Sequence, residues 1–421
     1  METPEFIREY ANADVKTLAL LGKRFPKVDM PFAINQIQGR QLAKTKLPMW
    51  AAIDGIIYPP HLNMEQCSSE QTAVYKQKLV RRLINSVEVN GKTSLIDLTG
   101  GFGVDFSYMS QVVETACYVE RNKQLCSIAE QNFKRLRLKN VMLKNKDSIE
   151  FLQTLEPQTI LFLDPARRNV NGGKVVSIED CEPNVLALRD ELMSKSQFTI
   201  VKLSPMLDWH KAVEQLECVS EVHILSVGNE CKELLLVLSA DEMAKNNKSE
   251  TRIKIVCVND EQCFEYERNN EKEANSSLKQ RIFDMNSPLP NFLYEPNASL
   301  MKAGDYAQIT DRHDIAAIGI NSHLFVANHW ERNFPGRQFK IIDYCSLNKK
   351  ELKEKIAGIT QANISVRNFP MRVEELRKRL KIKDGGEVYI FATTRQNKEY
   401  IPQIRNLTFQ RPSCVYTSSH Y

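Results

Sequence analysis

The sequence predicts an α/β fold, a doubly wound sheet of seven strands with helices between the first five. Four short apolar runs of strand length each end in or lead to an acidic residue, and segments with helical periodicity lie between them. The acids are Asp97, Glu120, Asp147 and Asp164. Because ligands of open α/β sheets bind at the carboxyl ends of the strands, we expect these four carboxylates to line one site.

The first apolar run leads into a glycine-rich turn. Residues 94–98 are followed by Thr99-Gly100-Gly101-Phe102-Gly103, and a helix is expected from Val104. Glycine supplies the backbone angles of such a turn, which lets backbone N–H groups and a helix N-terminus approach a ligand. The spacing excludes a dinucleotide fingerprint, because Phe106 occupies the third glycine position, and a P-loop, because the turn contains no lysine. On this motif alone, a tight turn without a ligand is an equal alternative.

The remaining elements continue the alternation of strand and helix. An amphipathic helix is expected over residues 123–138 and another over residues 183–193. The further strands are expected at residues 116–120, 141–143, 160–163, 198–203, 222–225 and 234–238. The last two strands close the edge of the sheet.

Composition indicates a globular protein with a sizeable core. The chain has 421 residues, 42% hydrophobic and 26% charged, and this length predicts two to four domains. No apolar stretch approaches the roughly 20 residues of a membrane span, and the N-terminus lacks a signal-peptide segment. The ten cysteines form no Cys-x-x-Cys pair, and the seven histidines add no metal-type spacing. We therefore expect a cytoplasmic protein with reduced cysteines and no metal.

Charge is unevenly distributed along the chain. Residues 1–335 hold 40 Lys and Arg against 44 Asp and Glu, whereas residues 336–421 hold 17 against 8. The basic segment predicts an anionic partner, most plausibly nucleic acid, with a solvated helical face as the alternative. Within it, a helix over residues 372–380 is apolar on one face, and the basic side chains in and just after it are candidate RNA contacts: Arg372, Arg377, Lys378, Arg379 and Lys381.

A polar segment at residues 62–76 precedes the sheet. Ser69 is expected to cap a helix that runs through Arg82. The segment is then either a capped helix leading into the sheet or a second wall of the ligand site, formed by Gln66, Ser68 and Thr72. The residues leave these two interpretations equally open.

Several motifs resemble a bacterial group of class I S-adenosylmethionine (SAM)-dependent methyltransferases that carry a ferredoxin-like domain and a C-terminal THUMP-like domain. The motifs are Glu-Gln-Cys-Ser-Ser-Glu at residues 65–70, Asp-Leu-Thr-Gly-Gly-Phe-Gly-Val-Asp at 97–105, Asp-Pro-Ala-Arg-Arg at 164–168, Lys-Leu-Ser-Pro at 202–205 and Lys-Asp-Gly-Gly at 383–386. The resemblance implies a Rossmann-like, seven-stranded methyltransferase core with small α+β domains after it. The parts expected are an N-terminal helical region, a SAM-binding domain, a ferredoxin-like domain and a THUMP-like RNA-docking domain, at residues 1–90, 91–245, 246–338 and 339–421.

The resemblance also implies roles for individual residues. Gly101 and Gly103 would approach the methionine part of SAM, and Asp97 would face its amino group. Glu120 would hold the ribose hydroxyls and Asp147 the adenine amino group, since carboxylates accept hydrogen bonds from each of these groups. The cofactor set is completed by the neighbours of these positions and the helical segment: Thr99, Ser148, Gln66, Ser68 and Thr72. Thr99 stands where the family motif often begins its glycines.

The stretch after the fourth strand gives the candidate catalytic residues Asp164, Pro165 and Arg167. Amino-methyltransferases have Asn/Asp-Pro-Pro-aromatic at this point, where the acid binds the target amine and the aromatic ring stacks on the flipped base. Here the second proline and the aromatic residue are both missing. Asp164 could orient a nucleophile or accept its proton, and Arg167 could hold a phosphate. A carbon-5 mechanism needs a cysteine, and the nearby Cys181 is expected to be structural.

The sequence thus predicts a SAM-dependent methyltransferase that acts on structured RNA, such as tRNA or rRNA. Two other classes stay open: an RNA-binding protein that keeps the fold without catalysis, and a methyltransferase for a small molecule or a protein. The identity of the RNA, the nucleotide and the methylated atom is not predicted.

Overall fold

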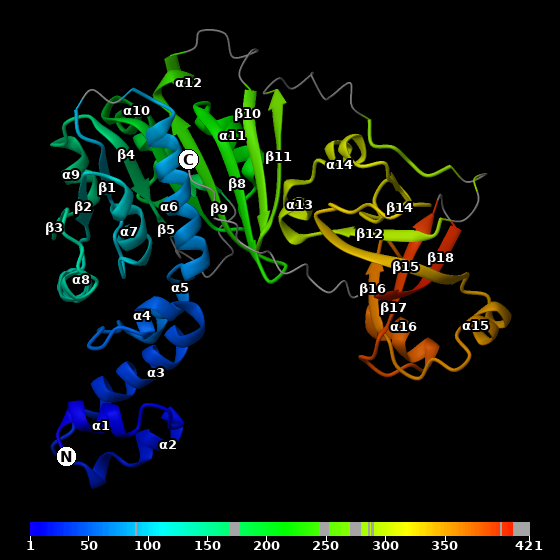
Figure 1. The fold of residues 1–421 in the computed structure, drawn as a ribbon, viewed down its shortest axis with the longest axis horizontal. Coiled ribbons are helices and arrows are strands. Elements are labelled where there is room, and N and C mark those ends of the chain that lie inside the picture. Colours follow the sequence, from blue (N-terminus) through cyan, green and yellow to red (C-terminus); the bar gives the residue numbers. More distant parts are fainter. Residues whose placement is uncertain are drawn as a thin grey trace, which may run out of the picture. The chain divides into compact units, whose positions relative to one another are not determined.

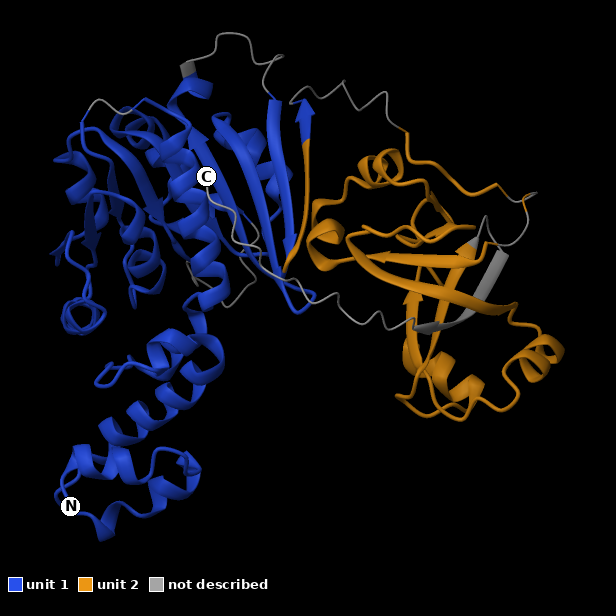
Figure 2. Cartoon of the chain, in the orientation of Figure 1, with its two compact units in different colours: residues 1–260, 267–271 blue, residues 261–266, 272–421 orange. Residues whose placement is uncertain are grey.

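A computed structural model describes residues 1–88, 91–167, 177–244, 252–269, 279–284, 287, 290–395 and 398–406. The chain divides into two compact units (Figure 2). Unit 1 comprises residues 1–260 and 267–271, and unit 2 comprises residues 261–266 and 272–421. Within the described residues, no helix combines the length and apolar character that a membrane span requires.

Unit 1 contains eight strands, and the last residues of a ninth, of a sheet in the order β11-β10-β8-β9-β7-β4-β1-β2-β3 (Figure 1). Its strands are β1 (Ser94–Asp97), β2 (Thr115–Val119), β3 (Val141–Lys144), β4 (Gln158–Leu163), β7 (Ser196–Leu203), β8 (Val219–Val227), β9 (Glu230–Ser239), β10 (Arg252–Asn259) and β11 (Gln262–Asn269). Strands β3, β2, β1, β4 and β7 pair in parallel, whereas β9 runs antiparallel to β7 and to β8. The predicted doubly wound core with two closing strands is confirmed.

Helices accompany this sheet and form an N-terminal segment. They are α1 (Thr3–Glu9), α2 (Val15–Leu20), α3 (Met30–Lys46), α4 (Pro48–Ala51), α5 (His61–Gln66), α6 (Glu70–Asn85), α7 (Val104–Met109), α8 (Lys123–Arg135), α9 (Ser148–Gln153), α10 (Val185–Lys195), α11 (Trp209–Leu216) and α12 (Ala240–Ala244). A two-stranded sheet of β5 (Ala166–Arg167) and β6 (Cys181–Glu182) lies outside the main sheet. Ser69 caps α6 as expected, its side chain accepting from the Thr72 N–H.

The main core lies between the sheet and helices α6, α7 and α8. Leu79, Val80 and Leu83 of α6 pack with Phe106 of α7 and Phe133 of α8 in one buried cluster that includes sheet side chains. Burying such a side chain contributes about 1.5–3 kcal/mol to the free energy of folding. This packing fixes the glycine turn between β1 and α7 relative to the sheet.

Strand β10 differs from the sequence-based expectation. Residues 253–258 are predicted as a strand of the second α+β domain, but β10 pairs in parallel with β8 and extends the core sheet. The predicted boundary at residues 245/246 therefore does not mark the end of this sheet. An apolar strand pattern does not specify the partner strand, so the placement of β10 could not be derived locally.

Unit 2 contains a seven-stranded sheet in the order β13-β14-β12-β15-β18-β17-β16. Its strands are β12 (Phe292–Pro296), β13 (Ala316–Ala317), β14 (Phe325–Ala327), β15 (Gly336–Cys345), β16 (Asn363–Arg367), β17 (Val388–Arg395) and β18 (Lys398–Asn406). Its helices are α13 (Ala298–Ala303), α14 (Tyr306–Arg312), α15 (Lys349–Lys355) and α16 (Val373–Leu380). The predicted boundary at residues 338/339 falls inside β15, which pairs with both β12 and β18.

Candidate active site

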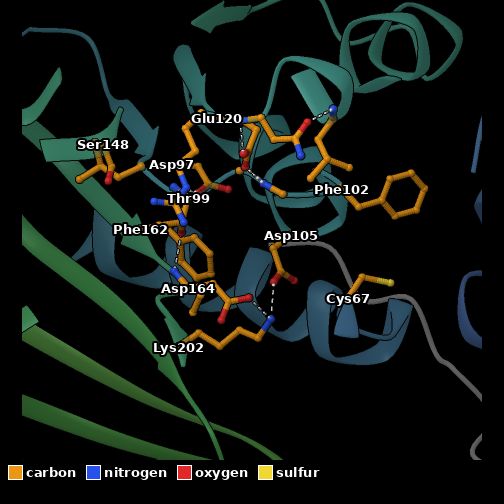
Figure 3. Close-up of a pocket in the computed structure, with 18 of the residues that line it drawn as sticks. Cys67, Asp97, Thr99, Phe102, Asp105, Glu120, Ser148, Phe162, Asp164 and Lys202 are labelled. Atoms are coloured by element: carbon orange, nitrogen blue, oxygen red, sulfur yellow. Dashed lines mark hydrogen bonds and ion pairs between the residues drawn. The ribbon is translucent and has the colours of Figure 1, made fainter. Parts of the chain in front are cut away.

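A pocket of about 400 Å³ lies at the carboxyl ends of the first four strands of unit 1 (Figure 3). Asp97 ends β1, and Glu120, Asp147 and Asp164 follow β2, β3 and β4. All four carboxylates line the pocket, although they come from separate stretches of the chain. The structure thus brings together the acids that the sequence pattern placed at one edge of the sheet.

The glycine turn forms one wall of this pocket, and its glycines serve different purposes. A Cβ atom on Gly100 would lie 2.1 Å from the ring of Tyr118, and one on Gly103 would lie 2.7 Å from the ring of Phe133. These two glycines are therefore required by core packing. Gly101 has a φ of 55° and would meet only a backbone oxygen at 3.7 Å, so it is the glycine with open space beside it.

Glu120 and Asp97 are held by backbone N–H groups. The Glu120 carboxylate accepts from Gly101 N–H at 2.8 Å and from Asn122 N–H at 2.7 Å, which fixes the turn against the second strand. Asp97 is 1% exposed and accepts from Thr99 N–H at 3.0 Å. Burial holds the pKa of Asp97 well above its usual range, and nearby carboxylates add to the effect.

Asp147 and Ser148 lie at the start of α9. Asp147 caps this helix by accepting from Ile149 N–H at 2.9 Å. Both residues line the pocket, as does Thr99, whose hydroxyl accepts from Asp164 N–H at 2.6 Å. The backbone of the first strand end is thereby connected to that of the fourth.

The polar segment before the sheet contributes to two cavities. Gln66 and Ser68 line the pocket and also a second cavity of about 1090 Å³ beside it. Thr72, predicted for the cofactor site, lines the second cavity, and its hydroxyl donates to Glu233 at 2.8 Å. The segment is thus both a capped helix and a wall of the site.

A buried cluster of charged side chains lies beneath these cavities. Lys76 is fully buried, contacts Asp105 at 3.0 Å and forms a very short ion pair with Glu233. Lys202 lies 2.6 Å from Asp164 and 3.4 Å from Asp105. Burial alone would raise the pKa of Glu233, but the two lysines lower it to about 2. Burial opposes the charge of Lys202, yet the neighbouring carboxylates raise its pKa well above the usual value.

Sequence reasoning missed the role of both lysines. Lys76 lies in the buried stripe of α6 with Thr72, Ala73 and Val80, and a lysine inside such a stripe was the available signal. Lys202 stands out in the sequence only as part of its Lys-Leu-Ser-Pro motif. The partners of both lysines come from distant parts of the chain, so spacing could not reveal them.

The candidate catalytic residues follow strand β4. Burial raises the pKa of Asp164, and the ion pair with Lys202 opposes this effect. Pro165 is buried and lines the second cavity. The backbone of Arg167 ends β5, but its side chain lies outside the described residues, as does all of Arg168. Cys181 is buried in β6.

The five candidate RNA contacts lie in or beside α16 of unit 2. Arg372, Lys378, Arg379 and Lys381 are exposed. Arg377 is largely buried and donates to the Ala362 carbonyl at 3.1 Å and to Asp384 at 2.6 Å. Its guanidinium therefore stabilises the local fold of this unit.

Three family profiles match parts of the chain. The profile of protein-L-isoaspartate(D-aspartate) O-methyltransferase matches residues 59–172, a ferredoxin-like domain matches residues 292–335, and a THUMP domain-like profile matches residues 336–402. A solved structure described as a "putative methyltransferase from Porphyromonas gingivalis W83" is 29% identical, with a TM-score of 0.79 over 97% of this chain and 99% of that chain. The chain thus contains a methyltransferase domain, with ferredoxin-like and THUMP-like domains after it.

Other solved structures resemble shorter parts of this methyltransferase. An O-methyltransferase from Bacillus cereus in complex with SAH is 13% identical, covering 54% of this chain and 100% of that chain with a TM-score of 0.33. An rRNA methylase from Streptococcus thermophilus is 11% identical, covering 39% and 93% with a TM-score of 0.29. Among curated proteins there is no significant match.

SAM is the cofactor of this methyltransferase, and the pocket fits it. The cofactor carries positive charge on its sulfonium and amino groups, and Asp97, Glu120 and Asp147 present carboxylates to the pocket. The basic side chains at its wall are already paired, Arg121 with Glu182 at 2.9 Å and Lys202 with Asp164. An anionic cofactor would meet an excess of like charge here, whereas a cation is favoured.

We expect SAM binding to release protons through Asp97. Burial raises the pKa of Asp97 and so favours its neutral form in the free protein, whereas a bound cation would favour the ionised form. The affinity for SAM should therefore rise with pH, and it should level off once Asp97 is already ionised in the free protein. Calorimetry at several pH values between about 5 and 8, in buffers of different ionisation enthalpy, measures the released protons. Asp97→Asn should abolish this proton release and weaken the binding of SAM. If the variant released as many protons as the wild type, Asp97 would not be their source.

We expect Lys76→Met to destabilise unit 1 strongly. The substitution keeps the apolar stem but leaves Glu233 and Asp105 buried without this ammonium. Removing one partner of a buried ion pair costs about 3–5 kcal/mol. Urea denaturation of the full chain should show this loss in the free energy of unfolding.

A matched control is Lys134→Met, since Lys134 is 71% exposed and pairs with Glu130 on one helix. Lys134→Met should change the free energy of unfolding by no more than about 0.5 kcal/mol. The double variant Lys76→Met with Glu233→Gln should recover part of the loss. If Lys76→Met were as stable as Lys134→Met, the cluster would not contribute to folding.

Proposed function

We propose that this methyltransferase modifies a nucleotide in structured RNA, such as tRNA or rRNA, and that its basic C-terminal unit docks the RNA. The single observation that carries the proposal is the concentration of positive charge in residues 336–421, which hold 17 basic against 8 acidic residues. The same stretch contains the THUMP domain-like match. A basic surface of this kind binds the phosphate backbone, which provides affinity without sequence readout.

Within the pocket, we propose that each carboxylate receives one part of SAM. Asp97 faces the amino group, Glu120 accepts from the ribose hydroxyls and Asp147 accepts from the adenine amino group, with Gly101 as the open backbone position beside the methionine part. Ser68 and Gln66 close the opposite wall. When bound, the cofactor supplies a methyl group that a nucleophile can displace from the sulfonium.

Asp164 is proposed as the residue that orients the nucleophile and receives its proton. It lines both the cofactor pocket and the larger cavity, so it lies where methyl donor and acceptor meet. Burial raises its pKa, which makes its carboxylate a stronger base than one in water, and Lys202 holds one of its oxygens. Pro165 shapes the adjoining wall of the larger cavity.

A protein acceptor is the second candidate, because the profile matched at residues 59–172 is that of a protein O-methyltransferase. Transfer of a labelled methyl group from SAM to an extract from cells that lack this protein separates the two. Label in nuclease-sensitive material supports the RNA proposal. Label in protease-sensitive material supports the second candidate.

We expect the exposed basic residues near α16 to determine the salt dependence of RNA binding. The triple variant Arg372→Ser, Lys378→Gln and Lys381→Asn removes three charges while respecting the helix start and the positive φ of 55° at Lys381. The slope of the logarithm of affinity against the logarithm of salt should become shallower by roughly 0.7–0.9 for each phosphate that the variant no longer neutralises. Filter binding with total tRNA at several salt concentrations measures it.

The matched control removes the same kinds of charge from the connection between α2 and α3, with Lys23→Gln, Arg24→Ser and Lys27→Gln, which are exposed positions. Its salt slope should equal that of the wild type. Equal slopes for all three proteins would place the RNA-binding surface elsewhere.

We expect Asp164→Asn to impair turnover with little effect on binding. The substitution keeps the shape of the side chain but removes the proton acceptor, and positioned proton transfer contributes about 10²–10⁴ in rate. Single-turnover transfer of labelled methyl groups measures the rate, and calorimetry measures the affinity for SAM. Full turnover in this variant would exclude Asp164 as the catalytic base.

A further inference from the structure

The larger cavity beside the cofactor pocket gives information about the methyl acceptor. It has a volume of about 1090 Å³ and shares Ser68, Asp164 and Lys202 with the pocket, so a substrate placed there reaches the donor. Its wall also contains Lys46, which donates to the Met64 and Glu65 carbonyls, and Lys232, which pairs with Glu230. None of the residues described as lining the cavity is aromatic.

The lack of aromatic rings in this wall argues against a flipped base as the target. Enzymes that modify a base extrude it and stack it between aromatic or other flat apolar side chains. The described wall instead consists of charged, polar and aliphatic side chains, with lysines and carboxylates in equal number, which suits a sugar hydroxyl better than a flat base.

The charged cluster at the floor of the cavity suits a nucleophile that must lose a proton as it reacts. An aliphatic hydroxyl is a weak nucleophile, so its attack needs a base for the proton and a cation for the charge that develops on oxygen. An unprotonated ring nitrogen of a base carries an available lone pair, has no proton to lose and needs chiefly orientation. The Asp164 carboxylate and the Lys202 ammonium, 2.6 Å apart at the junction of the two cavities, supply both requirements of the hydroxyl.

Lys202 is held in the ionisation state that this chemistry needs, and Asp164 has an oxygen for the proton. Lys202 stays protonated because Asp164, Asp105 and Glu233 raise its pKa, so it acts as a fixed cation and not as the base. Its ammonium contacts Oδ2 of Asp164, and in the described part of the chain no side chain donates to Oδ1. That second oxygen is therefore the acceptor for the proton.

Building on the proposed function, we propose that the methyl acceptor is the 2′-hydroxyl of a ribose in RNA, with Asp164 as base and Lys202 as the cation that stabilises the attacking oxygen. A bond forms between this oxygen and the methyl carbon, the carbon–sulfur bond breaks, and its electron pair stays on sulfur as the thioether of S-adenosylhomocysteine. The hydroxyl proton passes to Asp164. Along an RNA chain, the 2′-hydroxyl is the aliphatic hydroxyl of every nucleotide.

Lys76 and Glu233 act in this scheme as positioning residues. Lys76 is fully buried and does not reach the cavity, but its ion pairs fix Asp105 and Glu233, the carboxylates that face Lys202. The Thr72 hydroxyl and Lys76 occupy the two oxygens of Glu233. The orientation of Lys202 toward Asp164 thus depends on a cluster drawn from α6, α7 and β9.

The position of the transferred methyl group in the product tests the proposal. The full chain is incubated with methyl-labelled SAM and total RNA from cells that lack this protein, and the RNA is hydrolysed with alkali. A methyl group on the 2′-oxygen prevents cleavage of the next phosphodiester, so label should appear in alkali-resistant dinucleotides. Label in mononucleotides would overturn the ribose assignment while leaving the RNA proposal intact. Absence of label from all RNA would overturn the RNA proposal and this inference with it.

The variant Lys202→Met tests the role of the cation. Turnover should fall by about 10²–10³, the usual loss when one donor to a developing oxyanion is removed. The dissociation constant for SAM, measured by calorimetry, should not rise, because a positive charge leaves the wall of a pocket that binds a cation. The control variant Lys134→Met, on an exposed face of α8, should have the turnover and the dissociation constant for SAM of the wild type.

A pH profile distinguishes this role from a structural one. In the wild type, the rate of methyl transfer should rise with pH as Asp164 ionises. Lys202→Met should move this rising limb of the profile to higher pH, because Asp164 would then face only the carboxylates of Asp105 and Glu233. A structural defect would lower the melting midpoint without moving the limb. Turnover within tenfold of wild type, or an unmoved limb, would overturn the assignment of Lys202.

Discussion

The ion pairs of Lys76 are the interaction on which the architecture of the site depends. A fully buried ammonium is costly unless it is paired and hydrogen-bonded, and Lys76 contacts Glu233 of β9, Asp105 of α7 and the Ser68 hydroxyl. These contacts tie α6 to the sheet and to the helix that follows the glycine turn. As a result, the segment before α6 is held where Gln66 and Ser68 line both cavities.

The cluster also couples the cofactor pocket to the larger cavity. Asp105 accepts from Ser68 at 2.7 Å and lies between the two lysines, with Lys76 on one side and Lys202 on the other. Because one carboxylate serves both cations, a change of charge at either lysine alters the environment of the other. Interactions inside a protein are screened less than in water, so this coupling extends from the buried floor to Asp164 at the junction.

The sequence predicted the parts of the site that follow local rules. The acids after successive strands and the cap at Ser69 depend on neighbours in the chain, and the structure has them as expected. Lys76 and Glu233 are separated by 157 residues and Lys202 and Asp105 by 97, so only the folded sheet brings them together. The same limit applies to β10, whose partner strand depends on competition among the edges of the sheet and not on its own pattern.

The electrostatics of the chain also explain why a methyltransferase of RNA would need a separate basic unit. Residues 1–335 carry 40 basic against 44 acidic residues, and the pocket wall holds an excess of carboxylates that suits a cationic cofactor. The same carboxylates repel phosphates, so the site that binds SAM well contributes little affinity for a polyanion. Under the proposed function, the surplus of positive charge in residues 336–421 would supply the affinity for RNA that the cofactor site lacks. Separating the two tasks would, under the proposed function, let Asp164 stay in the pocket without weakening the capture of RNA.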